Sequence, residues 1–327
     1  MKAFFNLIRW QNLLIVVLTM MLMRYAVLEP LISKISVILQ KGTGEEVPVI
    51  LQSSIIDFIL LVVATVFLTA GGYVINDYFD IKTDLINKGK VIVGTRIPRR
   101  QAMMWHNLFN IAGVSIGFYI SWKAGYFWLG TMFLVVSGLL YFYSASYKRQ
   151  FLIGNLVVAT LVAMVPLLVV IYEWPALYRY YTINAVTLPD FNLIIYWVGG
   201  FAVFAFLTTL SREIIKDIED FEGDIAYGRN TVPVVIGILA TKIVSVSLVV
   251  LTIALLYLVW YFFINDNITL IYLSAAIVLP LAWVIFKVVA SSNRKQLHHA
   301  SSIMKVVMLT GILYSLVVKA ILTWNLF

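Results

Sequence analysis

Long apolar runs separated by short polar segments repeat along the whole chain. A helix that crosses a membrane needs about 20 mostly apolar residues, and windows of this kind recur through the sequence. The pattern predicts nine transmembrane helices, at Trp10–Leu28, Ser53–Tyr78, Gln101–Trp122, Gly125–Tyr147, Phe151–Tyr172, Phe191–Lys216, Val232–Phe263, Ile268–Val289 and Ser301–Trp324. Everything between them is predicted to be loop. The expected fold class is all-α, a polytopic membrane bundle around a central cavity.

The composition leaves little room for a water-soluble domain. Apolar residues make up 62% of the 327 residues, and charged residues only 12%. No linker or shift in composition divides the chain, so residues 1–327 are predicted to form a single integral-membrane domain. The sequence contains no cysteine, which excludes disulfides, thiolate metal sites and cysteine nucleophiles.

Basic residues are distributed unevenly between the two predicted faces of the bundle. Six of the 24 Lys and Arg fall on the face away from the N-terminus: Arg24, Lys34, Lys41, Lys123, Arg179 and Lys319. The other face holds the remainder, and such an excess marks the cytoplasmic side. The net charge of +8 is therefore interpreted as a topology signal rather than a nucleic-acid-binding surface. We expect a protein of the cell inner membrane, among membrane lipids, with its N-terminus in the cytoplasm and its C-terminus outside.

An acidic segment follows the second predicted helix. It reads Asn76-Asp77-Tyr78-Phe79-Asp80-Ile81-Lys82-Thr83-Asp84. Asn76, Asp80 and Asp84 recur every four residues, so they would share one face of a helix. Carboxylates this close repel one another unless a hard cation or a basic group compensates them. Ligand sets made only of oxygen favour magnesium or calcium.

A second acidic segment follows the sixth predicted helix. It carries Asp217, Asp220 and Asp224 at positions i, i+3 and i+7, again on one helical face. One acidic run at a helix end is typical of a solvated cap. Two runs with helical spacing, both at cytoplasmic helix ends, favour a functional site, because carboxylates at a membrane boundary are costly.

Two facing carboxylate stripes are suited to a diphosphate bound through Mg²⁺, and we expect two bridging ions. The divalent cation offsets the repulsion between the carboxylates and the diphosphate. Basic residues suited to the leaving group follow the first segment, lie after the fourth predicted helix and surround the second segment; in that order they are Lys82, Lys88, Lys90 and Arg96, then Lys148 and Arg149, then Arg212, Lys216 and Arg229. An allylic substrate that loses its diphosphate leaves a carbocation, which aromatic faces stabilise. Tyr143 and Tyr147, beside Lys148, are the candidates for an aromatic wall that faces this carbocation.

These segments resemble the signatures of the UbiA family of intramembrane prenyltransferases. Asn76-Asp77-x-x-Asp80-x-x-x-Asp84 is similar to the first family motif, Asp217-x-x-Asp220-x-x-x-Asp224 to the second, and Tyr143-Ser144-x-x-Tyr147-Lys148 to a third feature. The likeness covers nearly the whole chain. It implies a Mg²⁺-dependent enzyme that transfers a prenyl group from a prenyl diphosphate to a lipophilic or aromatic acceptor. One departure is the stretch Asn87-Lys88-Gly89-Lys90-Val91-Ile92, where many relatives carry Asn-Arg-Pro-x-Arg-Pro.

The resemblance also implies roles for individual residues. The implied metal ligands are Asn76, Asp80, Asp220 and Asp224. Residues implied to support the metal or the reaction are Asp77, Asp84 and Asp217, with Tyr143 and Tyr147 at the reacting carbon. Contact with the diphosphate is expected from Lys148 and the basic first cytoplasmic loop, Lys88 and Lys90, and from Arg149, Arg212 and Lys216.

The acceptor and the function class each have alternatives. The segment from Arg212 to Asp220 looks most like enzymes that prenylate geranylgeranylglyceryl phosphate in ether-lipid synthesis, and an aromatic acceptor of a quinone-, haem- or chlorophyll-type pathway is the alternative. A transporter or cation channel would place a charge near the middle of a span, whereas the span centres here are nearly uncharged. The Asp-Gly and Ala-Arg signature of CDP-alcohol phosphatidyltransferases is absent.

Overall fold

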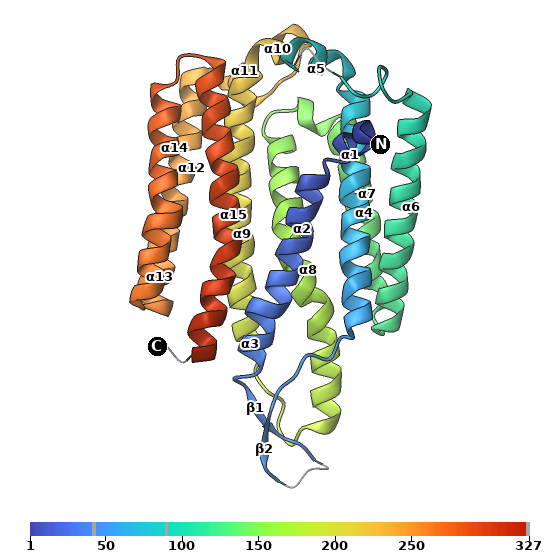
Figure 1. Ribbon diagram of the computed structural model, residues 1–327, viewed down its shortest axis with the longest axis vertical. Helices are drawn as coiled ribbons and strands as arrows, with labels where there is room; N and C mark the ends of the chain where they lie inside the picture. The colour runs from blue at the N-terminus through green and yellow to red at the C-terminus, as the bar shows by residue number, and fades with distance from the viewer. Residues whose placement is uncertain (41–43, 89–90, 325–327) are drawn as a thin grey trace.

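The computed structural model describes residues 1–40, 44–88 and 91–324. Its long helices run side by side along one axis and form a bundle (Figure 1). Helices suit an apolar chain of this kind, because every backbone N–H and C=O finds a partner within its own segment.

The N-terminal half holds two short strands and most of the helices that frame the site. Its elements are α1 (Lys2–Leu7), α2 (Trp10–Leu22), the π-helix η1 (Met23–Leu28), α3 (Glu29–Ile32), β1 (Ser36–Ile38), β2 (Glu46–Pro48), α4 (Ile55–Phe79), α5 (Ile81–Lys88), α6 (Arg99–Lys123), η2 (Phe127–Leu129), α7 (Gly130–Ala145), η3 (Tyr147–Arg149) and α8 (Ile153–Asn184).

The C-terminal half contains helices and loops but no strand within the described residues. Its elements are α9 (Asn192–Glu219), α10 (Phe221–Ala226), α11 (Val232–Ile236), α12 (Ile238–Val259), the π-helix η4 (Trp260–Ile264), α13 (Asn267–Tyr272), the π-helix η5 (Leu273–Val278), α14 (Leu279–Ala290) and α15 (Arg294–Trp324).

Eight helical segments of the described chain are long and apolar enough to cross a membrane. They correspond to eight of the nine predicted spans. The remaining prediction, Gln101–Trp122, is the 25-residue helix α6, which is more polar but packs along α4. The two helices approach closely at Gly113, where a Cβ atom would lie 3.1 Å from the carbonyl oxygen of Ala64. The all-α membrane bundle is confirmed.

Helix α8 is longer than predicted. The predicted fifth span ended at Tyr172, before Glu173 and Pro175, yet α8 continues to Asn184. Glu173 is buried in an ion pair with Arg24 of η1, at 3.1 Å, so its charge does not end the helix. The predicted end of this helix was wrong because Arg24, which neutralises Glu173, lies on another helix and is not evident from the local sequence.

The predicted seventh span begins differently. Val232–Ile236 forms the separate short helix α11, and α12 starts only at Ile238. Gly237 separates them with a φ of 82°, a conformation that glycine adopts without steric cost. Helices α10 and α11 lie at one end of the bundle (Figure 1).

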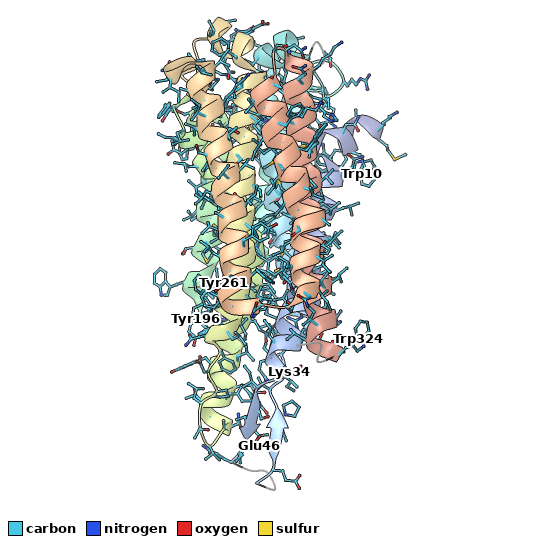
Figure 2. The ribbon with its side chains drawn as sticks, turned by 90° about the vertical axis from the view of Figure 1, so that its left-hand side faces the viewer. Trp10, Lys34, Glu46, Tyr196, Tyr261 and Trp324 are labelled. Carbon is cyan, nitrogen blue, oxygen red and sulfur yellow. The ribbon has the colours of Figure 1, made fainter. Side chains whose placement is uncertain are left out.

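The loop between the first two spans contains a hairpin that the sequence pattern missed. Strands β1 and β2 pair antiparallel, with Val37 opposite Val47. Leu39 forms a bridge with Ala185, so the hairpin packs beside the far end of α8, beyond the rest of the bundle (Figure 1). Figure 2 shows Lys34 and Glu46 beyond the level of Tyr196, Tyr261 and Trp324, whose side chains are exposed.

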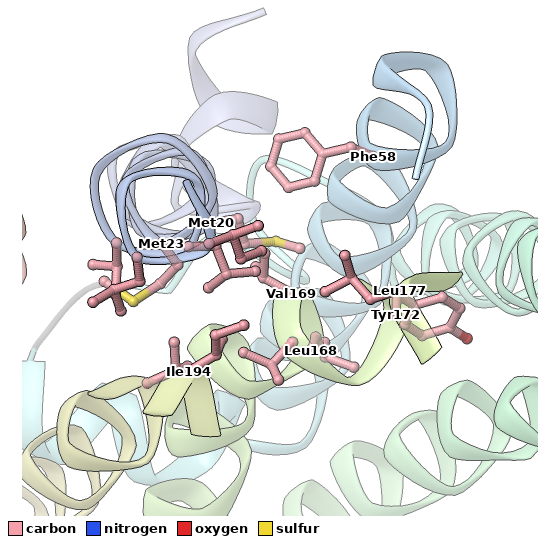
Figure 3. Close-up of a cluster of buried hydrophobic side chains, with 14 of the residues drawn as sticks. Met20, Met23, Phe58, Leu168, Val169, Tyr172, Leu177 and Ile194 are labelled. Carbon is pink, nitrogen blue, oxygen red and sulfur yellow. The ribbon is translucent and has the colours of Figure 1, made fainter. Parts of the chain in front are cut away.

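The largest buried cluster joins helices from both halves of the chain. Figure 3 shows its members from α2, η1, α4, α8 and α9, among them Met20, Met23, Phe58, Leu168, Val169, Tyr172, Leu177 and Ile194. Such packing fixes the helices relative to one another through many small dispersion contacts.

The termini lie toward opposite ends of the bundle. The N-terminus is near the end that carries α5 and α10, and α15 ends at the other (Figure 1). This arrangement agrees with an odd number of long helices, as predicted. It also leaves the two acidic segments together at one end.

Candidate active site

The two acidic segments meet where α5 packs against α10. Each contains the same kind of break: α4 ends before Asp80 and α9 ends before Asp220. The Asp80 N–H donates to the Asn76 carbonyl at 3.0 Å, and the Asp220 N–H donates to the Lys216 carbonyl at 2.9 Å. The continuous helical face predicted for each segment is therefore interrupted at its middle carboxylate.

Arg229 bridges the two segments. Its Nη2 donates to Asp80 Oδ1 at 2.8 Å and to Thr83 Oγ1 at 2.7 Å, while Nη1 lies 3.4 Å from Asp224 Oδ1. Thr231 holds the other Asp224 oxygen through a hydrogen bond of 3.0 Å. The planar guanidinium can address two carboxylates at once, which an ammonium does less well. One carboxylate from each acidic segment thus faces a single cation.

Lys148 approaches the same carboxylate from the fourth predicted span. Its Nζ lies 2.7 Å from Asp80 Oδ1 and 3.2 Å from the amide oxygen of Asn76. The backbone of η3 reaches this position because Gly154 has no side chain, since a Cβ there would lie 2.6 Å from the Lys148 Cα. Asp80 therefore has two basic partners, Lys148 and Arg229.

Burial and charge set the protonation of these groups. Burial raises the pKa of Asp224 to about 6, although Arg229 and Thr231 oppose the shift. Burial acts in the same direction on Asp80, but Lys148 and Arg229 outweigh it, so the pKa of Asp80 falls below its usual value. Burial lowers the pKa of Lys148 to about 8, against the attraction of Asp80. Near neutral pH both carboxylates are ionised and Lys148 is largely protonated.

The other predicted carboxylates have partners of their own. Asp77 accepts from Arg9 Nη2 at 2.9 Å, Asp217 accepts from Asn155 Nδ2 at 2.8 Å, and Asp220 accepts from Arg294 Nη2 at 3.0 Å. Asp84 lies in the first turn of α5, where its N–H donates to the Asp80 carbonyl at 2.8 Å. The structure thus gathers the predicted acids at one end of the bundle without placing them all around one point.

A second charged group lies further into the bundle on α9. Glu213 pairs with Arg212 at 2.6 Å and with Lys216 at 3.4 Å. Lys305 of α15 lies within electrostatic range of both cations and of Arg9. The Arg212 Nε is buried and has no hydrogen-bond partner within the described ranges. The carboxylate within electrostatic range of Lys305 is Glu219, so the cations of this group share two carboxylates, Glu213 and Glu219.

The two predicted aromatic residues occupy different surroundings. Tyr143 lies within electrostatic range of Glu213, Asp80 and Asp217, so it faces the charged interior. The Tyr147 ring lies 6.1 Å from that of Phe142, a residue with an exposed side chain. Tyr143 thus lies near both acidic segments.

Three further predicted diphosphate contacts are Arg149, Lys88 and Lys90. The Arg149 side chain is exposed, and its carbonyl accepts from the Asn230 N–H at 2.8 Å. Lys88 ends α5, and Lys90 lies outside the described residues. Their predicted roles remain predictions.

Four contributing residues escaped the sequence reasoning. Arg9 and Asn155 lie outside both acidic segments, and Thr83 and Thr231 have no predicted role. The one available signal was Asn155, a polar amide at the start of a strongly apolar span. Such residues usually face a partner inside the bundle.

The donor chemistry of the site fits a hard cation. Asp80, Asp224 and the Asn76 amide offer only oxygen, the preference of Mg²⁺. Within the residues that the structure describes, no three His, Cys, Asp or Glu side chains form a metal-binding group. Lys148 and Arg229 instead neutralise these carboxylates.

Comparisons with known proteins agree with this picture. The family model of the UbiA prenyltransferase family matches residues 50–321. A digeranylgeranylglyceryl phosphate synthase of Methanobrevibacter smithii is 32% identical over 282 residues, which cover 86% of this chain and 92% of that protein.

Solved structures share the fold. A structure described as a digeranylgeranylglyceryl phosphate synthase in membranes matches 96% of this chain and 98% of its own, with 23% identity and a TM-score of 0.62. A UbiA homologue from Archaeoglobus fulgidus, solved with GPP and Mg²⁺, matches 96% of this chain and 99% of its own, with 16% identity and a TM-score of 0.53.

Proposed function

The chain belongs to the UbiA prenyltransferase family, and from that premise we propose that it transfers a prenyl group from a prenyl diphosphate to a phosphate-bearing lipid, with Mg²⁺. The observation that carries the proposal is the Arg229 bridge. It holds Asp80 of the first acidic segment and Asp224 of the second against one cation, with Lys148 beside them. Carboxylates that can bind a metal and cations that can bind phosphate oxygens lie side by side there, and a metal–diphosphate complex requires both.

Magnesium would be held by Asn76, Asp80, Asp220 and Asp224. When bound, it supplies charge that stabilises the departing diphosphate. Lys148 contacts Asp80, and Arg229 contacts Asp80 and Asp224, so these two cations are the side chains proposed to bind the diphosphate oxygens. We propose two ions, because the carboxylates come from two separate segments. The GPP- and Mg²⁺-bound homologue from Archaeoglobus fulgidus supports the choice of metal.

The prenyl tail is proposed to lie among the helices. The head sits at the end of the bundle where α5 and α10 meet, and apolar helices extend away from it. Tyr143 faces the charged interior and would border the reacting carbon, where an aromatic face stabilises positive charge and excludes water. Tyr147 is proposed for the same wall.

The acceptor is proposed to carry a phosphate. Arg212 and Lys216 pair with Glu213, and Lys305 lies within electrostatic range of both cations and of Glu219, so three cations gather at a distance from the diphosphate contacts. An anionic headgroup would be bound there more readily than a neutral aromatic ring. The name of the Methanobrevibacter smithii relative, a digeranylgeranylglyceryl phosphate synthase, points to geranylgeranylglyceryl phosphate.

The active-site end is proposed to face the cytoplasm. The protein is integral to a membrane, and most of its basic residues are assigned to the end that carries α5 and α10. Basic loops are retained on the cytoplasmic side, so the N-terminus would lie there as well. The cell inner membrane is the proposed location.

Turnover by the purified chain tests the proposal. Geranylgeranyl diphosphate and geranylgeranylglyceryl phosphate should give a product only with Mg²⁺, and chelation should stop the reaction until Mg²⁺ is restored. Asp80→Ala and Asp220→Ala should remove most activity. Asp190→Ala changes an exposed carboxylate in the loop before α9 and should leave the rate unchanged. Normal rates in both active-site variants would contradict the ligand assignment.

The acceptor assignment has its own test. Lys305→Gln should raise the KM for the phosphorylated acceptor several-fold while the KM for the donor stays constant. Lys295→Gln, an exposed lysine on the same helix, is the matched control. Efficient prenylation of an aromatic acceptor, with none of the glyceryl phosphate, would establish the alternative class.

A further inference from the structure

A cavity of about 340 Å³ lies at the end of the bundle opposite the acidic segments. It is bounded by the start of α4, the end of α6 and the C-terminal part of α8. One side is apolar, with Phe58, Leu61, Ile120 and Val169. A volume of this size is in the range that binds small ligands. None of its lining residues belongs to the proposed active site.

Basic residues gather at this cavity against the general trend of the sequence. The sequence assigns only six Lys and Arg to this end, and three of them line the cavity: Arg24, Lys123 and Arg179. Topology alone favours few basic residues on this side. Their convergence from three separate segments therefore needs another explanation.

Two of the three cations are already neutralised. Arg24 pairs with buried Glu173 at 3.1 Å, and Lys123 pairs with Asp57 at 2.7 Å. Arg179 is exposed and makes no ion pair or hydrogen bond with any residue that the structure describes. The cavity thus retains one positive charge, that of Arg179.

The Arg179 guanidinium lies close to the turn after α6. Gly125, in that turn, has a φ of 83°, and a Cβ there would lie 3.1 Å from Arg179 Nη1. The absence of a side chain at Gly125 therefore leaves room for the guanidinium. Arg179 lines the cavity together with the residues of its apolar side.

The mouth of the cavity lies at the level of a membrane interface. Trp122 and Trp128 flank the turn at Gly125, and they are 68% and 80% exposed. Exposed tryptophan and tyrosine side chains gather where lipid headgroups meet the acyl region. Phosphate groups of lipids lie at this depth.

We propose that this cavity binds a lipid phosphate, with the phosphate on Arg179 and the first part of the apolar chain along Leu61, Ile120 and Val169. The phosphate accepts hydrogen bonds from the guanidinium, and the chain replaces solvent against the apolar wall. The ligand would be a structural lipid, distinct from donor and acceptor. A free phosphate ion shares the headgroup chemistry but has no chain.

Native mass spectrometry of the purified full chain tests the site. Phosphatidylglycerol, phosphatidylcholine and inorganic phosphate are added separately, and bound adducts are counted. Arg179→Gln should lower the affinity for phosphatidylglycerol by roughly tenfold to a hundredfold, as the loss of one charge-assisted hydrogen bond would. Ala176→Phe, which fills the cavity without changing charge, should lower it as well. Lys319→Gln, an exposed cation at the same end, should have no effect.

Each other outcome counts against part or all of the proposal. Equal binding by wild type and Arg179→Gln, or an equal loss in Lys319→Gln, would overturn the site. Inorganic phosphate binding that depends on Arg179 but is insensitive to Ala176→Phe would overturn the lipid and leave an anion site. Prenyl transfer should be unchanged in all three variants, which separates this result from any failure of the proposed reaction.

Discussion

The buried ion pair between Arg24 and Glu173 gives the sharpest prediction about stability. Arg24 is 5% exposed and Glu173 is 1% exposed. Arg24 donates to Ser53 Oγ at 2.6 Å, to the Ser53 carbonyl at 2.7 Å and to Glu173 at 3.1 Å, and it lies over the Phe58 ring at 4.8 Å. Replacing Arg24 with Met removes the cation and leaves a buried carboxylate.

The expected loss of stability in Arg24→Met follows from the contacts that Glu173 keeps. Glu173 would keep hydrogen bonds from the Gln52 and Ser53 N–H groups, at 2.6 and 3.1 Å, but no opposite charge. Breaking a buried pair on one side costs about 3–5 kcal/mol. The matched variant is Lys123→Met, which breaks the more exposed pair with Asp57 and should cost only about 0.2–1 kcal/mol.

SDS titration in mixed micelles, followed by tryptophan fluorescence, measures the free energy of unfolding. The double variant Arg24→Met/Glu173→Gln removes both charges and keeps an acceptor for the N–H groups. It should recover about 2 kcal/mol relative to Arg24→Met. If Arg24→Met and Lys123→Met were equally destabilising, the buried pair would be no stronger than a surface pair, and the reasoning from burial would be refuted.

Three further predictions concern the active site. Arg229→Lys keeps the charge but not the fork that bridges both acidic segments, so kcat should fall roughly 10- to 100-fold with little change in unfolding, and a near-normal rate would contradict the bridge. Replacing both Tyr143 and Tyr147 with Leu should lower prenyl transfer and raise the prenyl alcohol by-product, while the affinity for the donor stays nearly unchanged. If donor binding were lost instead, with a constant ratio of alcohol to product, the two tyrosines would be packing residues. Asp224 gains a proton as the pH falls through about 6 and Lys148 loses one as the pH rises through about 8, so the rate should be bell-shaped between these values. Lys148→Arg should remove only the upper limb, and an unchanged upper limb would exclude Lys148 as its source.

Local properties of the sequence were enough to predict most of the fold. Span positions follow from runs of apolar residues, because each stretch must satisfy its own backbone in a membrane. Acidic segments at the ends of the second and sixth spans were therefore expected at one end of the bundle, and α5 and α10 do meet there. Lys148, which the family resemblance implied as a diphosphate contact, lies beside the first segment and contacts Asp80.

Only the tertiary structure decided which charges pair. Arg229 and Asp80 are 149 residues apart, as are Arg24 and Glu173. No periodicity in one segment specifies a partner in another, because the pairing depends on how the helices pack. For this reason the sequence pattern ended the fifth span at Tyr172, whereas in the structure α8 continues through the buried Glu173. The sequence determined where the helices and acidic motifs lie, and packing determined which cation each carboxylate faces.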